Sequence, residues 1–248
     1  MADSDSANSF TFADHLVLDD SPTRDFYKSV MQGLIHKNNN ILGVIQGFSS
    51  LVLMDDVNPE IRENVEQMRD SAGIASNLAK VILTASGCSR VTPERINLGD
   101  LLPHLEDTAR QLCEASGVTL QFNARPNLPP ILADTNRLSE LVSELIKNAV
   151  EAAAAQPDGE VAVDVLPPGE ASPAEDGCVD FFIRNSSEDL TPEKLREAFA
   201  PFTGNKGNAH FGLGLTTAAV LAGQMKMRLG LRSSGGTTTA WLSMPVAR

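Results

Sequence analysis

The most regular part of the sequence is residues 21–52, SPTRDFYKSVMQGLIHKNNNILGVIQGFSSLV. Ser21 is typical of a helix N-cap, and Pro22 is typical of a first helical turn. The apolar residues that follow recur mostly at steps of three, four or seven: Phe26, Val30, Leu34, Ile41, Val44, Ile45, Phe48, Leu51 and Val52. This period predicts one long amphipathic helix.

A second helix is expected after a short turn at residues 55–59. Asn58 and Pro59 form another helix start, and Gly87 is a plausible stop. The apolar residues between them keep a helical spacing: Ile61, Val65, Met68, Ala72, Ile74, Leu78, Val81 and Ile82. Two helices of roughly 30 residues joined by a turn form a hairpin. Both carry apolar residues over more than one stripe, which predicts a symmetric dimer whose hairpins form a four-helix bundle.

The pattern changes after residues 89–97, which contain a proline and no helical period. Beyond them the patterns predict helices at 98–115, 134–155, 192–199 and 213–224, and strands at 118–122, 160–166, 178–185, 227–232 and 237–244. Such a mixture favours a sandwich with helices on one face of a mixed sheet. The predicted fold class is therefore α+β, with a flexible leader at 1–21, the hairpin at 22–88, a linker at 89–97 and the α/β sandwich at 98–248.

Composition excludes several classes of protein. The 248 residues contain 20 Lys and Arg against 32 Asp and Glu, so the formal charge is 20 − 32 = −12. Nucleic-acid binding and docking on an anionic membrane both depend on basic residues, so we expect neither. The 42% hydrophobic content is enough for a core, which must be mostly aliphatic because aromatic residues make up only 5%.

The remaining composition signals point to a cytoplasmic protein. Cys88, Cys113 and Cys178 are an odd number without motif spacing, so they indicate reduced thiols rather than disulfides or a zinc site. The first residues lack the basic and apolar regions of a signal peptide. The longest uncharged run, residues 38–54, is too short and too polar to span a bilayer. A leader of about 20 residues is too short to fold a domain of its own.

Three groups of residues carry chemistry. The first is His36 in the middle of the long helix, with Asn39 and Asn40 three and four residues later on the same face. An imidazole can carry a phosphoryl group on a ring nitrogen, and the amides can position a water or an incoming carboxylate. A lone histidine is more often part of a solvated helix face, but three consecutive Asn residues are unusual inside a helix.

The second group is the helix around residues 134–152. Its polar face carries Arg137, Glu140, Glu144, Asn148 and Glu151, opposite a buried face with Leu138, Leu141 and Leu145. Such a face can supply an oxygen ligand to magnesium and a carboxylate that orients water. An ordinary amphipathic helix would have the same spacing.

The third group is the segment 199–215, FAPFTGNKGNAHFGLGL, which runs into a helix. Glycines at the entrance of a helix let backbone N–H groups approach phosphates. A short Gly-x-Gly is a weak signal by itself.

These groups occur in the order found in sensor histidine kinases of two-component systems, which the chain resembles over residues 22–248. His36 lies where that family has its phosphoacceptor, and "ELIKNAVEA" matches its magnesium-binding N-box. "AFAPFTGNKG" matches the phenylalanine box and ATP lid, "HFGLGLTTA" the second glycine box, and "RSSGGTTTAWLSMP" the closing strands. The resemblance implies an ATP-binding domain of the histidine kinase type, whose γ-phosphoryl group passes to the histidine and then to an aspartate of a response regulator.

The resemblance also implies roles for individual residues. Catalytic roles fall to His36, to Asn40 at a position linked to phosphatase activity, and to Glu144 where related ATPases keep a catalytic glutamate. Asn148 would hold Mg²⁺. The expected ATP-binding residues are Lys147, Asn148, Asn185, Thr203, Lys206, Gly212, Gly214 and Leu215. The implied partners are a second copy of the chain and a response-regulator receiver domain. Because the leader is too short to fold a sensor domain, we expect the input to come from an upstream sensor protein or from the leader itself.

Several positions depart from the family pattern. Lys37 stands where the family has an acidic residue, and a cation cannot act as a base for the imidazole. Asn185 replaces the aspartate that recognises adenine, and both glycines of the first glycine box are missing from residues 185–189. His210 replaces the first glycine of the second box. An alternative is therefore a kinase-like histidine phosphotransfer or phosphatase protein with weak or no ATP binding.

Overall fold

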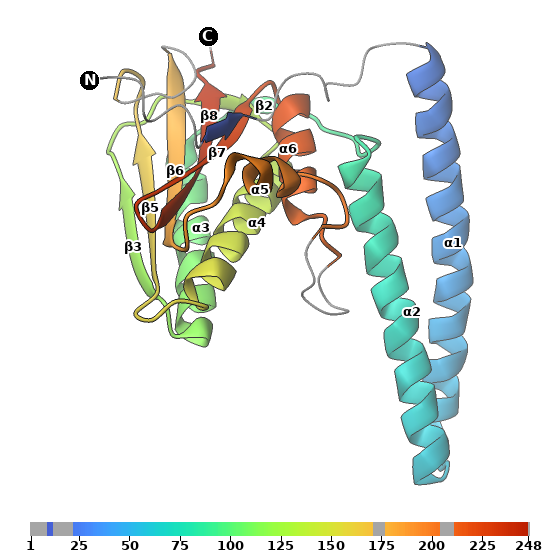
Figure 1. Cartoon of the computed structure of the whole chain (residues 1–248). Helices are drawn as coiled ribbons and strands as arrows, with labels where there is room; N and C mark the ends of the chain where they lie inside the picture. The colour runs from blue at the N-terminus through green and yellow to red at the C-terminus, as the bar shows by residue number, and fades with distance from the viewer. Residues whose placement is uncertain (1–8, 12–21, 171–176, 204–210, 248) are drawn as a thin grey trace. The chain divides into compact units, whose positions relative to one another are not determined.

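The computed structural model describes residues 9–11, 22–170, 177–203 and 211–247, and the chain divides into two compact units. One unit contains the two long helices and spans residues 18–89. The other contains the sheet with its helices, together with the N-terminal residues 9–11. Each unit is described by itself (Figure 1).

The first unit is an antiparallel helical hairpin of α1 (Pro22–Met54) and α2 (Pro59–Ala85). Asn58 caps α2, since its side chain accepts a hydrogen bond from the Ile61 amide at 2.9 Å, and Pro59 follows at the first helical position. The Ser76 hydroxyl donates to Asn39 Oδ1 at 3.3 Å between the two helices. At the end of α2 the chain folds back, and Gln32 Nε2 on α1 donates to the Cys88 carbonyl at 3.0 Å. The predicted hairpin is confirmed.

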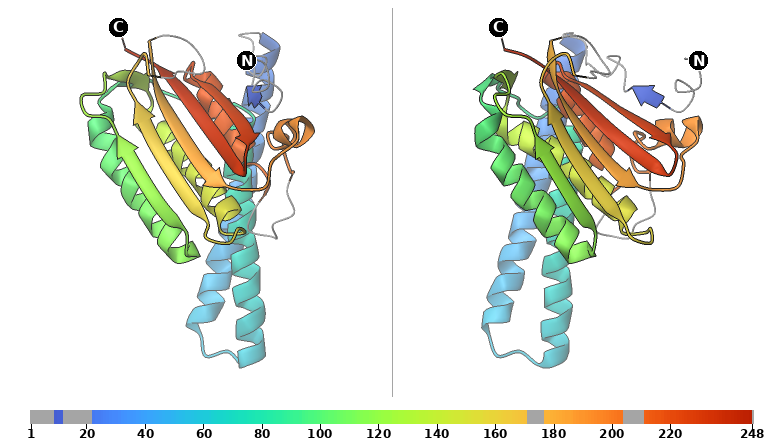
Figure 2. Two further views of the ribbon diagram at one scale, coloured as in Figure 1. Left: turned by 60° about the vertical axis from the view of Figure 1, so that its left-hand side comes forward. Right: turned by 90° about the vertical axis from the view of Figure 1, so that its left-hand side faces the viewer.

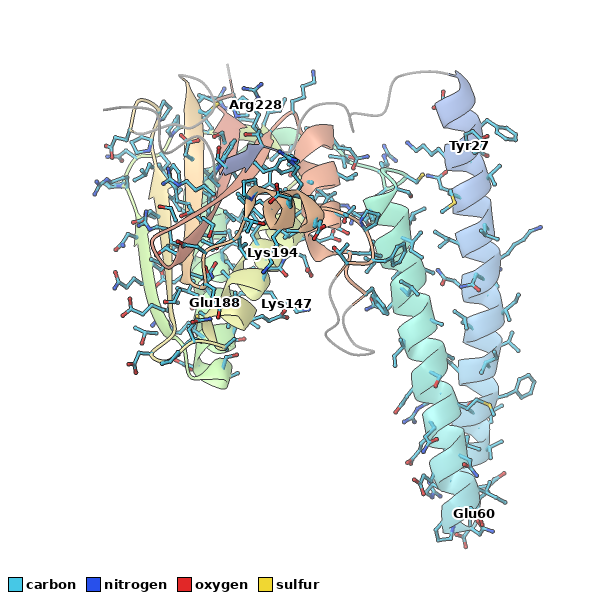
Figure 3. The ribbon with its side chains drawn as sticks, in the orientation of Figure 1. Tyr27, Glu60, Lys147, Glu188, Lys194 and Arg228 are labelled. Atoms are coloured by element: carbon cyan, nitrogen blue, oxygen red, sulfur yellow. The ribbon has the colours of Figure 1, made fainter. Side chains whose placement is uncertain are left out.

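Much of the apolar surface of this hairpin is exposed in the single chain. Tyr27 points outward near the start of α1 (Figure 3). The exposed large apolar side chains of the two helices are Phe26, Tyr27, Val30, Leu34, Ile41, Val44, Phe48, Leu51, Val52, Met54, Ile61, Met68 and Ile74. An apolar area of this extent is typical of an association surface.

The second unit is a two-layer α/β sandwich. Its six-stranded sheet has the order β1-β7-β8-β6-β5-β3, and β3 and β5 are its parallel pair among otherwise antiparallel neighbours. The strands are β1 (Ser9–Thr11), β3 (Thr119–Ala124), β5 (Glu160–Leu166), β6 (Cys178–Ser186), β7 (Arg228–Ser234) and β8 (Thr237–Pro245). The helices α3 (Leu98–Ser116), α4 (Thr135–Ala153) and α6 (Gly214–Gln224) cover one face of the sheet (Figure 2). The short helix α5 (Pro192–Glu197) precedes α6. The predicted fold class is confirmed for the secondary structure of both units.

The core lies between the sheet and α4. Leu138, Leu141 and Leu145 of α4 are almost completely buried, as the sequence predicted for this helix. They pack in one cluster with alternate residues of the strands, including Val161, Val163, Val179, Phe181 and Ile183. All three cysteines are buried and none forms a disulfide, and burial raises the pKa of the Cys113 thiol. The core is therefore mostly aliphatic. Because the apolar face of α4 is buried in this core, the polar face of α4 lies on the opposite side of the helix, outside the core.

Two short pairings were not predicted. Residues 9–11, inside the expected leader, form β1 and pair with β7 at the sheet edge. Residues 94–96, inside the expected linker, form β2 (Glu94–Ile96), which pairs with β4 (Ile131–Ala133) in a separate two-stranded sheet. Each segment buries one apolar side chain at its centre or end, Phe10 in part and Ile96 almost completely. Three residues are too few to show an alternating pattern.

Gly159 permits a close approach between α4 and the start of β5. A methyl group at this position would overlap the carbonyl group of Ala153, a backbone group that cannot move aside. We expect Gly159→Ala to lower the free energy of unfolding by about 1–3 kcal/mol, because overpacking forces backbone shifts. Urea unfolding followed by fluorescence of Trp241, which is buried in β8 and is the single tryptophan of the chain, would measure this. Gly99→Ala is the control, since its methyl would meet Asn97 only at ordinary contact distance, and equal losses for both variants would contradict the prediction.

Candidate functional site: a nucleotide cradle and an exposed histidine

Glu144 and Asn148 lie one turn apart on α4, on the face that does not enter the core. Both are half-buried. Asn148 Nδ2 is buried and has no hydrogen-bond partner in the described part of the chain. A buried donor without a partner is costly in a folded protein. This atom therefore indicates a place where a ligand completes the structure.

Gly214 brings the start of α6 against these two side chains. A Cβ atom on Gly214 would lie 2.8 Å from Glu144 Oε2 and 3.4 Å from Asn148 Nδ2, so the start of α6 lies directly against these two side chains and a larger residue would displace Glu144. Leu213 precedes the helix and provides no side-chain cap, which leaves the N–H groups of the first turn available. We name Glu144, Asn148 and the first turn of α6 the nucleotide cradle. Its donors and its helix dipole suit a phosphate group, and its side-chain oxygens suit Mg²⁺.

The segments before and after the predicted ATP lid are bonded to each other. The Phe202 amide donates to the Gly212 carbonyl at 2.8 Å, and the Thr216 hydroxyl in α6 donates to the Phe199 carbonyl at 3.0 Å. Gly212 has a φ of +64°, and a Cβ there would overlap the Thr203 carbonyl oxygen. The Thr203 hydroxyl donates to the Ala200 carbonyl at 2.7 Å. These bonds fix the two ends of the lid beside the cradle.

Two further residues that the sequence assigns to ATP binding lie close to Asn148 or at the start of α6. Lys147 lies half-buried on α4 next to Asn148 (Figure 3), and Leu215 lies half-buried in α6. Lys206 and His210 lie outside the described residues. Within the described residues there is no cluster of three or more His, Cys, Asp or Glu side chains that could hold a metal alone. A magnesium ion in the cradle would therefore need oxygens from the nucleotide in addition to Asn148.

The helix-facing side of the sheet becomes polar near its end. Val163, Ile183, Ala240 and Leu231 form an apolar row across β5, β6, β8 and β7. The next row of that face contains Val161, Asn185, Thr238 and Ser233. Asn185 is only 6% exposed, and its Nδ2 donates to the Ser186 carbonyl at 3.0 Å. A ligand at this end of the sheet would meet Asn185 Oδ1, which is a hydrogen-bond acceptor.

The loop that replaces the first glycine box is bound to the turn between β7 and β8. The Asp189 carboxylate accepts hydrogen bonds from the amides of Gly236 at 2.8 Å and Gly235 at 3.2 Å. The Leu190 amide donates to Ser233 Oγ at 2.9 Å, and the Ser187 and Thr238 hydroxyls lie 2.8 Å apart. Sequence reasoning missed this role of Asp189. The acidic residue and the distant Gly235-Gly236 turn gave no signal that they meet.

Restoring the family aspartate at position 185 should not improve this site. In Asn185→Asp, a buried carboxylate oxygen would face the Ser186 carbonyl in place of the amide donor. We expect a loss of about 1–3 kcal/mol in the free energy of unfolding. Urea unfolding followed by Trp241 fluorescence would measure the loss, and Gln121→Glu, which makes the same amide-to-carboxylate change on an exposed part of β3, is the control. An unchanged stability together with tighter ATP binding would contradict the prediction.

His36 lies on the exposed surface of α1. Asn40 Nδ2 lies 3.4 Å from His36 Nδ1, one helical turn away, and Lys37 is also exposed. Asn39 differs from Asn40, because it accepts the bond from Ser76 on α2 and thus holds the two helices together. The three consecutive Asn residues therefore include one that faces the imidazole and one that serves the hairpin. His36 and Asn40 are brought together as the sequence suggested.

The comparison with known proteins first defines a class of domain. Residues 133–248 match the family described as histidine kinase-, DNA gyrase B-, and HSP90-like ATPase. This range contains α4 and α6, which form the nucleotide cradle, together with the strands β5 to β8. The domain is therefore an ATPase domain of the histidine kinase type.

Curated relatives are similar to a longer part of the chain. The chain is 24% identical over 215 residues to the sensor histidine kinase ZraS of Salmonella typhimurium, which covers 85% of this chain and 44% of that protein. It is 27% identical over 222 residues to the sensory histidine kinase/phosphatase NtrB of Rhizobium meliloti, covering 87% of this chain and 57% of that protein. The chain is therefore similar to sensor histidine kinases over most of its own length, and it spans about half the length of these curated relatives.

Solved structures of histidine kinases have the same fold. The crystal structure of full-length ShkA in complex with AMPPNP matches with a TM-score of 0.73 at 22% identity, over 88% of this chain and 46% of that one. The histidine kinase AdeS of Acinetobacter baumannii matches with a TM-score of 0.54 at 12% identity, over 86% of this chain and 97% of that one. Within the described residues, no helix is long and apolar enough to cross a membrane.

Proposed function

We propose that the chain is the core of a two-component histidine kinase. It would transfer the γ-phosphoryl group of Mg-ATP to His36, and then to an aspartate of a response-regulator receiver domain. The nucleotide cradle carries this proposal, because the buried Asn148 Nδ2 without a partner faces the uncapped start of α6 across Gly214. A phosphate group with a magnesium ion satisfies both features.

Different residues of the chain would bind different parts of Mg-ATP. Amides of the first turn of α6 would hold phosphate oxygens, and Asn148 would hold Mg²⁺ through its carbonyl oxygen while Nδ2 donates to a phosphate. Bound Mg²⁺ would neutralise part of the phosphate charge, which matters in a chain with a formal charge of −12. Glu144 would orient a polar group at the γ-phosphate. Asn185 Oδ1 would accept from the adenine amino group, while Lys147, Lys206, Thr203, Gly212 and Leu215 would line the phosphates and the lid.

Phosphoryl transfer would then form a bond between phosphorus and a ring nitrogen of His36. The bond between the γ-phosphorus and the bridging oxygen breaks, ADP leaves, and the ring nitrogen loses its proton to solvent or to a base. Asn40, which lies 3.4 Å from His36 Nδ1, would fix the orientation of the ring. In the second step the phosphorus–nitrogen bond breaks as a regulator aspartate accepts the group. Exposure of His36 leaves it accessible to both partners.

The apolar residues exposed on α1 and α2 support a homodimer. In a monomer they would leave thirteen large apolar side chains of the hairpin in water, which is unfavourable. A second hairpin on this surface would complete the four-helix bundle.

We further propose that the protein works in the cytoplasm and receives its signal from an upstream sensor protein.

Incubation of the full chain with γ-labelled ATP and Mg²⁺ tests the proposal. We expect an acid-labile, base-stable label on the protein, which a purified receiver domain then removes. Absence of label together with absence of nucleotide binding would overturn the kinase function.

The second candidate is a histidine phosphotransfer or phosphatase protein that has a kinase fold. Lys37 favours it, because a cation beside His36 replaces the acidic residue that the family uses as a base. The bonds of Asp189 to Gly235 and Gly236 also favour it, because they tie down a loop that is rich in glycine in the family. Relatives named kinase/phosphatase show that both activities occur among similar proteins.

An experiment in which the label starts on the receiver domain, and not on ATP, distinguishes the two candidate functions. A receiver domain carrying labelled phosphoaspartate would be mixed with the full chain in the absence of ATP. Label that moves to His36, with none from ATP, favours the phosphotransfer protein. Label from ATP favours the kinase.

A further inference from the structure

The strand β1 joins the nucleotide-binding unit although its sequence precedes the hairpin. Ser9, Phe10 and Thr11 pair with Arg232, Leu231 and Gly230 on the edge strand β7. A Cβ at Gly230 would overlap the Trp241 ring on β8 and would lie 2.8 Å from the Phe10 carbonyl oxygen. The glycine therefore makes room for the Trp241 ring and also for the backbone of β1.

Phe10 connects this strand to the base of the lid. Its ring lies 5.5 Å from the Phe199 ring, at an angle of 47°. Phe199 is buried in the core at the residue where the lid region begins. Its carbonyl accepts the hydrogen bond from the Thr216 hydroxyl at 3.0 Å, within the first turn of α6. A line of contacts thus runs from Phe10 through Phe199 to the helix that forms one wall of the nucleotide cradle.

Few contacts hold β1 against β7, so we expect its docking to be weak. The strand has three residues, of which Phe10 is partly buried and the other two are exposed. Short segments with few buried contacts open locally at low free-energy cost. An aromatic pair contributes a modest but specific part of such a contact. The strand can therefore exchange between docked and released states while the rest of the unit stays folded.

We propose that β1 is a regulatory strand that controls nucleotide affinity, and that Phe10 is its positioning residue. The proposal rests on the nucleotide binding proposed above. In the docked state Phe10 holds Phe199, and Phe199 holds Thr216 and the start of α6 against Asn148. Release of β1 removes this support, so the nucleotide binds less tightly. Because coupling is reciprocal, a bound nucleotide also strengthens the docking of β1.

Calorimetric titration of the full chain with Mg²⁺ and a non-hydrolysable ATP analogue tests the first half. We expect Phe10→Ala to weaken binding by about three- to tenfold, the range that one aromatic pair supplies. Phe10→Tyr keeps the ring and should bind like the unmodified chain. Thr11→Ala is the matched control on the exposed side of the strand. Urea unfolding followed by Trp241 fluorescence would show that the variants remain folded.

Amide hydrogen exchange on the unmodified chain tests the second half, and it is informative even if Phe10→Ala does not fold. The analogue should slow exchange at residues 9–11 as well as at 213–217. Unchanged exchange at 9–11 with a bound analogue overturns the proposal, as does unchanged affinity in Phe10→Ala. No binding of the analogue to the unmodified chain would instead overturn the proposed function, and the inference with it.

Discussion

Replacing His36 with glutamine should reduce labelling of the chain by γ-labelled ATP by at least about a thousandfold, because glutamine offers no nucleophilic ring nitrogen. The side chain is exposed on α1, so the variant should keep its fold. Glutamine is also a good helix former and fits the middle of α1. The label would be measured after acid and base treatment, since phosphohistidine is lost in acid and kept in base.

His104→Gln is the control for this experiment. His104 is exposed on α3, in the other unit, and its side chain belongs to no site described above. The control should label like the unmodified chain. Label that persists in His36→Gln would place the phosphoacceptor elsewhere and remove the central residue of the proposed mechanism.

The second large effect is expected for Asn148→Asp. The change keeps the shape of the side chain but removes the buried Nδ2 donor and adds a negative charge one turn from Glu144. Two carboxylates facing a triphosphate repel it, so labelling from ATP should fall by at least about a hundredfold. Transfer from a phosphorylated receiver domain to His36 needs no nucleotide and should stay within about twofold.

Asn136→Asp is the matched control, because it places the same charge at an exposed position of the same helix. It should label like the unmodified chain. If Asn148→Asp also loses transfer from the receiver domain, the variant acts through folding or dimerisation, and the assigned role is wrong. If it keeps labelling from ATP, the cradle is not the magnesium site.

Periodic segments could be predicted from the sequence. The helices α1, α2 and α4 follow from apolar steps of three and four residues, and the strand β5 from strict alternation at 160–166. The polar face of α4 was predicted for the same reason, because residues four apart share a helix face. A long helix or strand with a regular apolar period can therefore be recognised from its own sequence.

Features that depend on pairing with a distant partner could not be predicted. The strand β1 exists because β7 offers an open edge and Phe199 offers a ring, and neither lies near it in the sequence. The orientation of Asn185 depends on a single carbonyl of the next residue. The bond between Asp189 and the Gly235-Gly236 turn joins residues more than forty positions apart. Such contacts are properties of the assembled sheet.

The place of β1 in the sheet also decides what a self-sufficient catalytic fragment would have to contain. The nucleotide-binding unit is discontinuous in sequence, since residues 9–11 complete a sheet whose other strands begin at residue 119. A fragment that starts at residue 98 would leave the backbone groups of β7 unpaired and the Phe199 ring partly uncovered. Unpaired edge strands invite pairing between copies. Such a fragment should self-associate through β7, and supplying the missing strand as a separate peptide should suppress that association.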